Sequence, residues 1–192
     1  MQKTFYIIAG CNGAGKTTAS FTILPDFLNC KEFVNADEIA RGLSPFQPET
    51  VAMEAGRLML MRMDTLMNSK TTFAFETTLA TKSYKNRIRN ARTQGYTIVL
   101  LFFWLRKVEL AIERVKIRVQ EGGHNIETET IKRRYVSGIR NLFQIYLPLV
   151  DEAMLFDNSE GRYELIAEQN TDSGIHIANE EKFTMLQQYE II

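Results

Sequence analysis

The feature that most constrains this chain is an eight-residue segment near its N-terminus, Gly10–Thr17, which reads GCNGAGKT. It fits the phosphate-binding loop pattern G-x-x-x-x-G-K-[ST] at every required position. The apolar run Phe5–Ala9 before it predicts a buried strand, and Lys16–Ile23 predicts a helix. The motif therefore lies between a strand and a helix N-terminus, which is the context that a phosphate site requires.

Each residue type in this loop has a chemical reason. Gly10, Gly13 and Gly15 allow backbone N–H groups to point inward without a Cβ in the way. Lys16 can reach the β- and γ-phosphates of ATP, and the Thr17 hydroxyl is suited to hold Mg²⁺. The predicted nucleotide-binding residues are Gly10, Cys11, Asn12, Gly13, Ala14, Gly15, Lys16, Thr17 and Thr18.

Composition argues against several other classes of protein. The length of 192 residues suits a single domain, residues 1–192. The 23 Lys plus Arg residues balance the 23 Asp plus Glu residues, so no overall charge favours binding to nucleic acid or to an anionic membrane. The two cysteines have no metal-type spacing, and the longest apolar run, residues 98–105, is too short to span a bilayer. With no signal-peptide pattern at the N-terminus, we expect a cytoplasmic protein that contacts neither nucleic acid nor membrane.

Apolar runs alternate with amphipathic stretches, which predicts an α/β three-layer sandwich with a parallel sheet between helices. The expected strands are Thr4–Ala9, Glu32–Ala36, Thr72–Phe75, Tyr96–Trp104, Ala153–Phe156 and Tyr163–Ala167. The expected helices are Lys16–Ile23, Thr50–Asn68, Ser83–Gln94, Val108–Gln120, Thr128–Leu147 and a closing helix over Glu180–Tyr189. Arg41–Pro48 is expected to be a loop. A methionine stripe, Met53, Met59, Met61, Met63 and Met67, predicts a core-facing helix surface.

Acidic residues at the ends of predicted strands are the next candidates, because ligands bind beyond the carboxyl ends of parallel strands. Asp37 and Glu76 each follow such a strand, and a carboxylate there can accept a proton from a hydroxyl or hold Mg²⁺ through water. The alternative is that either carboxylate caps the following helix. Asp157 follows a third run and is interpreted as a nucleotide-side or structural residue.

The region 106–135 is expected to form a small helical lid. Arg114 and Arg118 lie four residues apart on one predicted helix, hence on one face. Arginine offers planar donors for a transferring phosphoryl group, and a Gly-Gly turn offers a hinge. The alternative is an ordinary helical hairpin with solvated arginines. The other lid residues are Gly122, Gly123, His124, Arg133 and Arg134, with His124 interpreted as a turn residue or a supporting hydrogen-bond donor.

Taken together, these motifs resemble those of the zeta-toxin-like P-loop kinases, in particular the stand-alone bacterial branch also labelled predicted ABC-type ATPases. The matching segments run in order from residue 10 to about residue 159 and cover most of the chain. They are Gly10–Thr18, Asn35-Ala36-Asp37 with Arg41 and Pro45, Glu76-Thr77-Thr78-Leu79, Glu113-Arg114, Gly122–Ile126, Arg133-Arg134-Tyr135, and Tyr146–Asp151 leading to Asp157-Asn158-Ser159.

The resemblance implies a P-loop kinase fold with a five-stranded parallel sheet, ATP and Mg²⁺ as cofactors, and Asp37 as the base that activates a sugar hydroxyl. It also implies that Arg41, Glu76 and Thr78 lie at the substrate and that lid arginines contact the γ-phosphoryl group. UDP-N-acetylglucosamine is the candidate acceptor that the resemblance implies, and an antitoxin is the candidate partner. Glu127 departs from the family, since it stands where the toxin spacing would place a second lid arginine and where this branch usually has Pro.

Two other functions stay open from the sequence. One is an ABC-like or switch ATPase, which Val136-Ser137-Gly138 faintly supports but which lacks a Gly-Gly-Gln continuation and an Asp-Glu pair at a strand end. The other is a toxin that acts mainly through a protein partner. A small-molecule kinase is the leading hypothesis.

Overall fold

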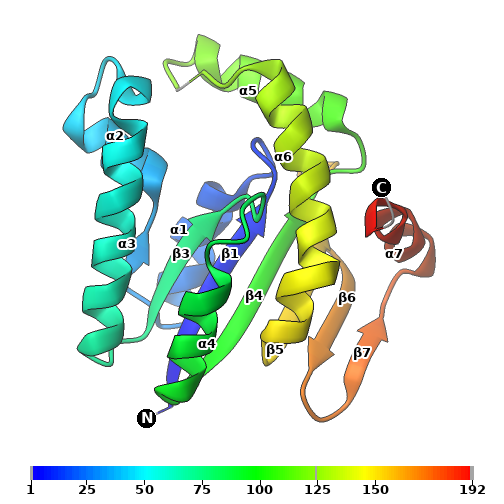
Figure 1. Cartoon of the computed structure of the whole chain (residues 1–192). Coiled ribbons are helices and arrows are strands. Elements are labelled where there is room, and N and C mark those ends of the chain that lie inside the picture. The colour runs from blue at the N-terminus through cyan, green and yellow to red at the C-terminus, as the bar shows by residue number, and fades with distance from the viewer. Residues whose placement is uncertain (1, 124, 191–192) are drawn as a thin grey trace.

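The computed structural model describes residues 2–123 and 125–190 and contains a seven-stranded sheet between helices (Figure 1). Across the sheet the strands run in the order β2-β3-β1-β4-β5-β6-β7, of which the first five are parallel and the last two antiparallel. The α/β class is confirmed, and the five expected parallel strands are extended by two antiparallel ones. The strands are β1 (Lys3–Gly10), β2 (Phe33–Val34), β3 (Phe73–Thr77), β4 (Tyr96–Trp104), β5 (Glu152–Asp157), β6 (Glu164–Asn170) and β7 (Gly174–Ile177).

Seven α-helices lie in the described residues, and those between parallel strands form the crossovers that such strands require. They are α1 (Lys16–Asp26), α2 (Ala36–Leu43), α3 (Ala52–Asn68), α4 (Lys85–Thr93), α5 (Val108–Gln120), α6 (Thr128–Asn141) and α7 (Glu180–Gln187). None of them combines the length and the apolar character needed to cross a bilayer.

The core lies around the central strands, where side chains on both faces are buried. Phe5, Ile7 and Ile8 of β1 are at most 1% exposed, and β4 is buried along nearly its whole length. Burial on both faces explains why these strands read as continuous apolar runs. Because β1 lies between β3 and β4, the loop after β1 opens onto the carboxyl ends of both neighbours. This is the edge where ligands of open α/β sheets bind.

The expected loop Arg41–Pro48 is wrong for residues 41–43, because α2 continues to Leu43, and a 3₁₀-helix begins at Pro48. Asn35 begins this helix, since its side-chain oxygen accepts hydrogen bonds from the backbone N–H groups of Asp37 and Glu38 at 2.8 and 3.4 Å. The same cap ends β2 at Val34, so this strand is shorter than expected.

One predicted helix ends earlier than expected, and one strand was not predicted from the sequence, while the boundaries of the other predicted helices lie within three residues of the expected ones. The expected helix Thr128–Leu147 ends as α-helix at Asn141 and continues as a π-helical segment, Leu142–Tyr146. The short strand β7 has exposed residues on both faces and so carries no alternating pattern. The closing helix is confirmed as α7.

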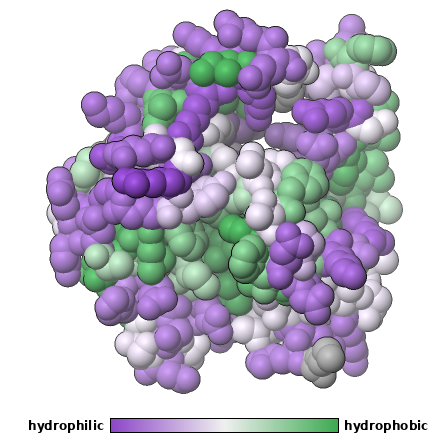
Figure 2. All heavy atoms as spheres, turned by 180° about the vertical axis from the view of Figure 1, so that it is seen from behind, coloured by the Kyte–Doolittle hydropathy of each residue, from purple (hydrophilic) through white to green (hydrophobic). Residues whose placement is uncertain are grey.

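The methionine stripe is core-facing only in part. Met59, Met63 and Met67 are buried, whereas Met53 and Met61 are 77% and 64% exposed, so the prediction is wrong for these two. Trp104 is buried, as expected for the end of the most apolar strand. Seen from behind, the molecule shows apolar side chains gathered across its middle, with polar ones above and below (Figure 2).

Candidate functional site

The phosphate loop connects β1 to α1 with three glycines at positive φ. Gly10, Gly13 and Gly15 have φ values of 141°, 77° and 84°, which side chains with a Cβ rarely adopt. Gly10 has an additional reason, since a Cβ there would lie 2.1 Å from the backbone oxygen of Phe103 in β4. The first glycine of the motif therefore also permits the close pairing of β1 with β4.

Lys16 and Thr17 both contact the carboxylate of Glu76 on β3. The Thr17 hydroxyl donates to Glu76 Oε2 at 2.8 Å, and Lys16 Nζ lies 3.4 Å from Oε1. Asn35 Nδ2 donates to the same Oε2 at 2.9 Å, and Lys16 also donates to the Cys11 carbonyl at 3.0 Å. Lys16 is 6% exposed, so its charge is compensated by this carboxylate and carbonyl.

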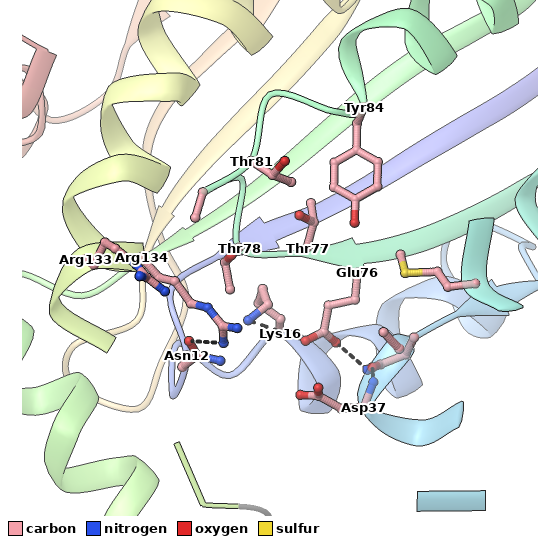
Figure 3. A pocket seen from close by; sticks show the side chains of 14 residues that line it. Asn12, Lys16, Asp37, Glu76, Thr77, Thr78, Thr81, Tyr84, Arg133 and Arg134 are labelled. Carbon is pink, nitrogen blue, oxygen red and sulfur yellow. Dashed lines mark hydrogen bonds and ion pairs between the residues drawn. The ribbon is translucent and has the colours of Figure 1, made fainter. Parts of the chain in front are cut away.

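Two cavities meet at this cluster. The first, which we call the Tyr84 cavity, has a volume of about 450 Å³ and is shown in Figure 3. The second, the phosphate-loop cavity, has about 390 Å³. Both are lined by the same four side chains, those of Asn12, Lys16, Asp37 and Glu76. These side chains form the boundary across which a group could pass from one cavity to the other.

The phosphate-loop cavity has a cationic and a polar wall. Thr17 and Thr18 line it beside the glycines, and Arg114 and Arg118 line it from α5. Asn158, Gly161 and Tyr163 close it from the segment after β5. The structure thus brings both predicted arginines of α5 to the cavity that contains Lys16.

The Tyr84 cavity combines hydroxyl, apolar and cationic side chains. Thr77, Thr78, Thr81 and Tyr84 line it from β3 and the segment before α4, and Met59 from α3. Arg133 and Arg134 line it from α6, and Arg134 donates to Asn12 Oδ1 at 3.3 Å (Figure 3). Burial lowers the pKa of the Arg134 guanidinium, and the negative charge of Asp37 opposes this effect. Arg134 therefore lies within the electrostatic influence of Asp37.

A sequence profile described as Zeta toxin matches residues 1–159. The chain belongs to the zeta toxin family. Membership in this family implies an ATP-dependent phosphotransferase. An uncharacterized protein of Haemophilus influenzae is 30% identical over 136 residues, which cover 70% of this chain and 94% of that protein.

Two solved structures show the same fold at low sequence identity. One is the AvrRxo1-ORF1:ORF2 complex with ATP, at 18% identity and a TM-score of 0.77, covering 96% of this chain. The chain spans 63% of the length of that relative. The other belongs to the PezAT toxin–antitoxin system of Streptococcus pneumoniae, at 18% identity and a TM-score of 0.70, covering 99% of this chain and 79% of that one.

The zeta-toxin element Glu76–Leu79 is held in an unusual backbone conformation. Leu79 is fully buried and has a positive φ of 56°, and its N–H donates to Thr77 Oγ1 at 3.1 Å. Helix α6 holds this segment in place, since Asn141 Nδ2 donates to the Leu79 carbonyl at 2.7 Å. Gly138 lies so close that a Cβ there would be 2.4 Å from the Thr78 carbonyl oxygen. The same helix therefore carries Arg133 and Arg134 and supports the threonine wall of the Tyr84 cavity.

This contact gives a first prediction. We expect Gly138→Ala to lower the free energy of unfolding by about 1–3 kcal/mol, the usual range for adding a methyl group to a tightly packed site. Gly56→Ala on α3 is the matched control, because nothing lies within 4 Å of a Cβ there. The control should be neutral or stabilising by up to about 1 kcal/mol. Urea denaturation measures the free energy of unfolding of both variants. An equal change in Gly138→Ala and Gly56→Ala would contradict the close packing at Gly138.

The remaining predicted residues have different surroundings, and not all of them line a cavity. Arg41 is exposed, pairs with Glu38 at 3.5 Å and lines neither cavity, so its substrate role stays a prediction. Gly122 has a positive φ of 86°, and Gly123 packs against the side chain of Arg118. His124 lies outside the described residues. Burial raises the pKa of the Cys11 thiol to about 11, so the thiol stays protonated. Cys11 contributes to the site through its backbone carbonyl, which accepts the hydrogen bond from Lys16.

The sequence did not assign several residues that line the two cavities, among them Asn35, Tyr84, Asn158 and Tyr163. Asn35 carried a signal, because an Asn two residues before an acidic residue at a helix start is a typical cap. The other three follow no local pattern. Asn158 Nδ2 donates to the Ala14 carbonyl of the phosphate loop at 2.9 Å, a contact across 144 residues of sequence.

Proposed function

We propose that this chain transfers the γ-phosphoryl group of ATP to a hydroxyl group of a small molecule. The main support for this proposal is that two cavities share lining residues, including Lys16, Asp37 and Glu76. One cavity is built around a phosphate loop, which suits the donor. The other contains threonine hydroxyls, an aromatic ring and two arginines, which suits a polar acceptor.

ATP would bind with its phosphates on the loop from Gly10 to Thr17. Backbone N–H groups and the N-terminus of α1 would receive the negative charge, and Lys16 would leave Glu76 to contact the β- and γ-phosphates. A relative of the same fold is described in complex with ATP, which supports this donor.

The donor set fits Mg²⁺, since Thr17 Oγ1 and the Glu76 carboxylate are oxygen ligands within 2.8 Å of each other. Thr17 would hold the ion directly and Glu76 through water. When bound, the ion neutralises charge on the β- and γ-phosphate oxygens. This assignment follows the Mg²⁺ alternative that the sequence left open for Glu76, rather than the substrate contact that the family resemblance implies.

Asp37 would act as the base. Its carboxylate is exposed at the start of α2 and borders both cavities. As the acceptor oxygen forms its bond to the γ-phosphorus, the bond between this phosphorus and the bridging oxygen breaks and ADP leaves. The hydroxyl proton passes to the Asp37 carboxylate. Arg114, Arg118 and Arg134 would stabilise the charge that spreads over the phosphoryl oxygens.

The acceptor that fits best is a sugar nucleotide such as UDP-N-acetylglucosamine. Arg133 and Arg134 suit its diphosphate, because guanidinium groups bind phosphate through paired donors. Tyr84 and Met59 offer an apolar surface for a base, and the threonines offer partners for sugar hydroxyls. An antitoxin partner is part of this proposal, since one solved relative is described as a complex of two proteins and the other belongs to a toxin–antitoxin system.

The lid arginines give a second prediction. Arg114→Ala should lower the rate of ADP formation by about 100-fold, the scale for losing one preorganised donor in the transition state. The affinity for ATP should fall much less, because such contacts strengthen only as charge develops. Arg162→Ala is the matched control, since Arg162 lies 79% exposed near the same segment. Equal rates for Arg114→Ala and wild type would remove Arg114 from the mechanism.

One experiment separates the proposed kinase from a switch ATPase. ADP formation from MgATP should be measured alone and with a panel of sugar nucleotides, nucleosides and free sugars. A kinase should form ADP several times faster with at least one hydroxyl-bearing acceptor. A rate that no acceptor changes, with free phosphate as the product, would favour the switch ATPase.

A further inference from the structure

A buried group of charges lies behind Arg114 and involves the C-terminal helix α7. Asp157, at the end of β5, is 3% exposed. Lys182 of α7 lies 2.8 Å from its Oδ2, and Arg106 Nε lies 3.3 Å from the same oxygen. Lys182 also contacts Glu164 Oε2 at 2.7 Å, but Glu164 is far more exposed. Asp157 therefore depends on two cations for its charge compensation.

The other oxygen of Asp157 organises the segment that follows it. Asp157 Oδ1 accepts a hydrogen bond from the Ser159 N–H at 2.8 Å and a second one from the Ser159 hydroxyl. The Ser159 Oγ in turn accepts from the backbone N–H of Arg106 at 2.9 Å. Burial raises the pKa of Asp157, but the hydrogen bonds from Lys182 and Ser159 outweigh it, and the net pKa lies below its usual value. The ionised carboxylate thus fixes the turn at residues 157–159.

Arg114 rests on this turn. Its Nη2 donates to the carbonyls of Asn158 and Ser159 at 2.8 and 3.1 Å, and its Nη1 lies 3.5 Å from the Gly13 carbonyl. The guanidinium is thereby oriented by backbone oxygens rather than by a carboxylate. Its full positive charge is left for an anionic ligand in the phosphate-loop cavity, which it lines.

We propose that Lys182 is a positioning residue that orients Arg114 through Asp157 and the turn at Ser159. Lys182 neutralises Asp157, Asp157 holds Ser159, and the carbonyls of this turn hold Arg114. The match to the zeta toxin family ends at residue 159, so this role belongs to the part of the chain beyond it. The effect on catalysis rests on the proposed function, whereas the effect on the orientation of Arg114 does not.

The loss of Lys182 should disturb the turn for an electrostatic reason. A buried carboxylate that loses one of two cations moves toward the remaining one, here Arg106, or takes up a proton. Both responses weaken its hydrogen bonds to Ser159. Glu164→Gln is the matched control, because it removes the other partner of Lys182 and leaves Asp157 untouched.

The direct test is NMR of the arginine side chains in the full chain with ¹⁵N-labelled arginine, with Arg114 assigned through Arg114→Lys. In wild type, Glu164→Gln and Lys182→Arg, the Nη–H signals of Arg114 should be separate, because the contacts with three carbonyls hinder rotation. In Lys182→Met they should merge. Ser159→Ala should merge them too, without leaving a buried charge unpaired. Separate signals in both Lys182→Met and Ser159→Ala would overturn the proposal.

A double-mutant cycle tests the consequence for the reaction. Lys182→Met should lower the rate of ADP formation by about tenfold at saturating ATP, less than the roughly 100-fold that an ångström of misplacement can produce. In the Arg114→Ala background it should have no further effect. Additive effects would overturn the route through Arg114. If wild type formed no phosphorylated product, the proposed function would fail, while the NMR result would still decide the role of Lys182.

Discussion

Replacing Lys16 by Ala is expected to reduce phosphoryl transfer about 1,000-fold, toward the upper end of the effect of one preorganised charged donor. The affinity for MgATP should also fall strongly, since Lys16 is the buried cation that the phosphate loop offers to the β- and γ-phosphates. Isothermal titration calorimetry with a non-hydrolysable ATP analogue measures the binding part of this expectation.

The control for this variant is Lys31→Ala, because Lys31 is exposed and lines neither cavity. Both variants should stay folded by circular dichroism. In Lys16→Ala the Glu76 carboxylate loses its ion pair but keeps hydrogen bonds from Thr17 and Asn35, so it is not left without donors. Unchanged nucleotide affinity in a folded Lys16→Ala protein would contradict the assignment of the phosphate loop.

Asp37→Asn should lower transfer to the acceptor by about 100-fold or more, the usual effect of removing a positioned base. ATP binding should change little. The substitution keeps the shape of the side chain and the backbone N–H that donates to Asn35, and it removes the negative charge and the ability to take up a proton. The rates of transfer and the affinity for ATP should be measured on the same preparation.

Glu38→Gln serves as the control for Asp37→Asn. Glu38 is the next residue of α2, is likewise exposed, pairs with Arg41 and lines neither cavity. It should transfer at the wild-type rate. If Asp37→Asn also did so, Glu76 would be the next carboxylate to examine.

Local patterns in the sequence were enough to predict the central strands and the phosphate loop. β1 and β4 are buried on both faces, so their apolar runs are long and unambiguous. The prediction failed where a local helix cap outweighed helix-breaking residues, and where strand pairing alone defines a strand. The helix α2 contains Gly42 and precedes two prolines, which favoured a loop, yet the cap at Asn35 starts a helix there. The exposed strand β7 forms because it pairs with β6.

The site could be predicted only where one motif carries it. Glu76 was recognised as a candidate, but its contact with Thr17 depends on the pairing of β3 beside β1, which no local pattern reveals. The support of Arg114 by Asn158 and Ser159 likewise joins segments more than 40 residues apart. Asp157 was interpreted from the sequence as a nucleotide-side or structural residue, and its ion pairs with Lys182 and Arg106 are contacts between distant elements.

The fate of the γ-phosphoryl group decides whether this chain is a kinase. ATP labelled at this group should be incubated with Mg²⁺ and the protein, with and without UDP-N-acetylglucosamine and other sugar nucleotides, and the products separated by chromatography. We expect wild type to transfer the label to an acceptor, and Asp37→Asn to form at least about 100-fold less labelled acceptor. Label found only in free phosphate, at the same rate with every acceptor, would contradict this expectation.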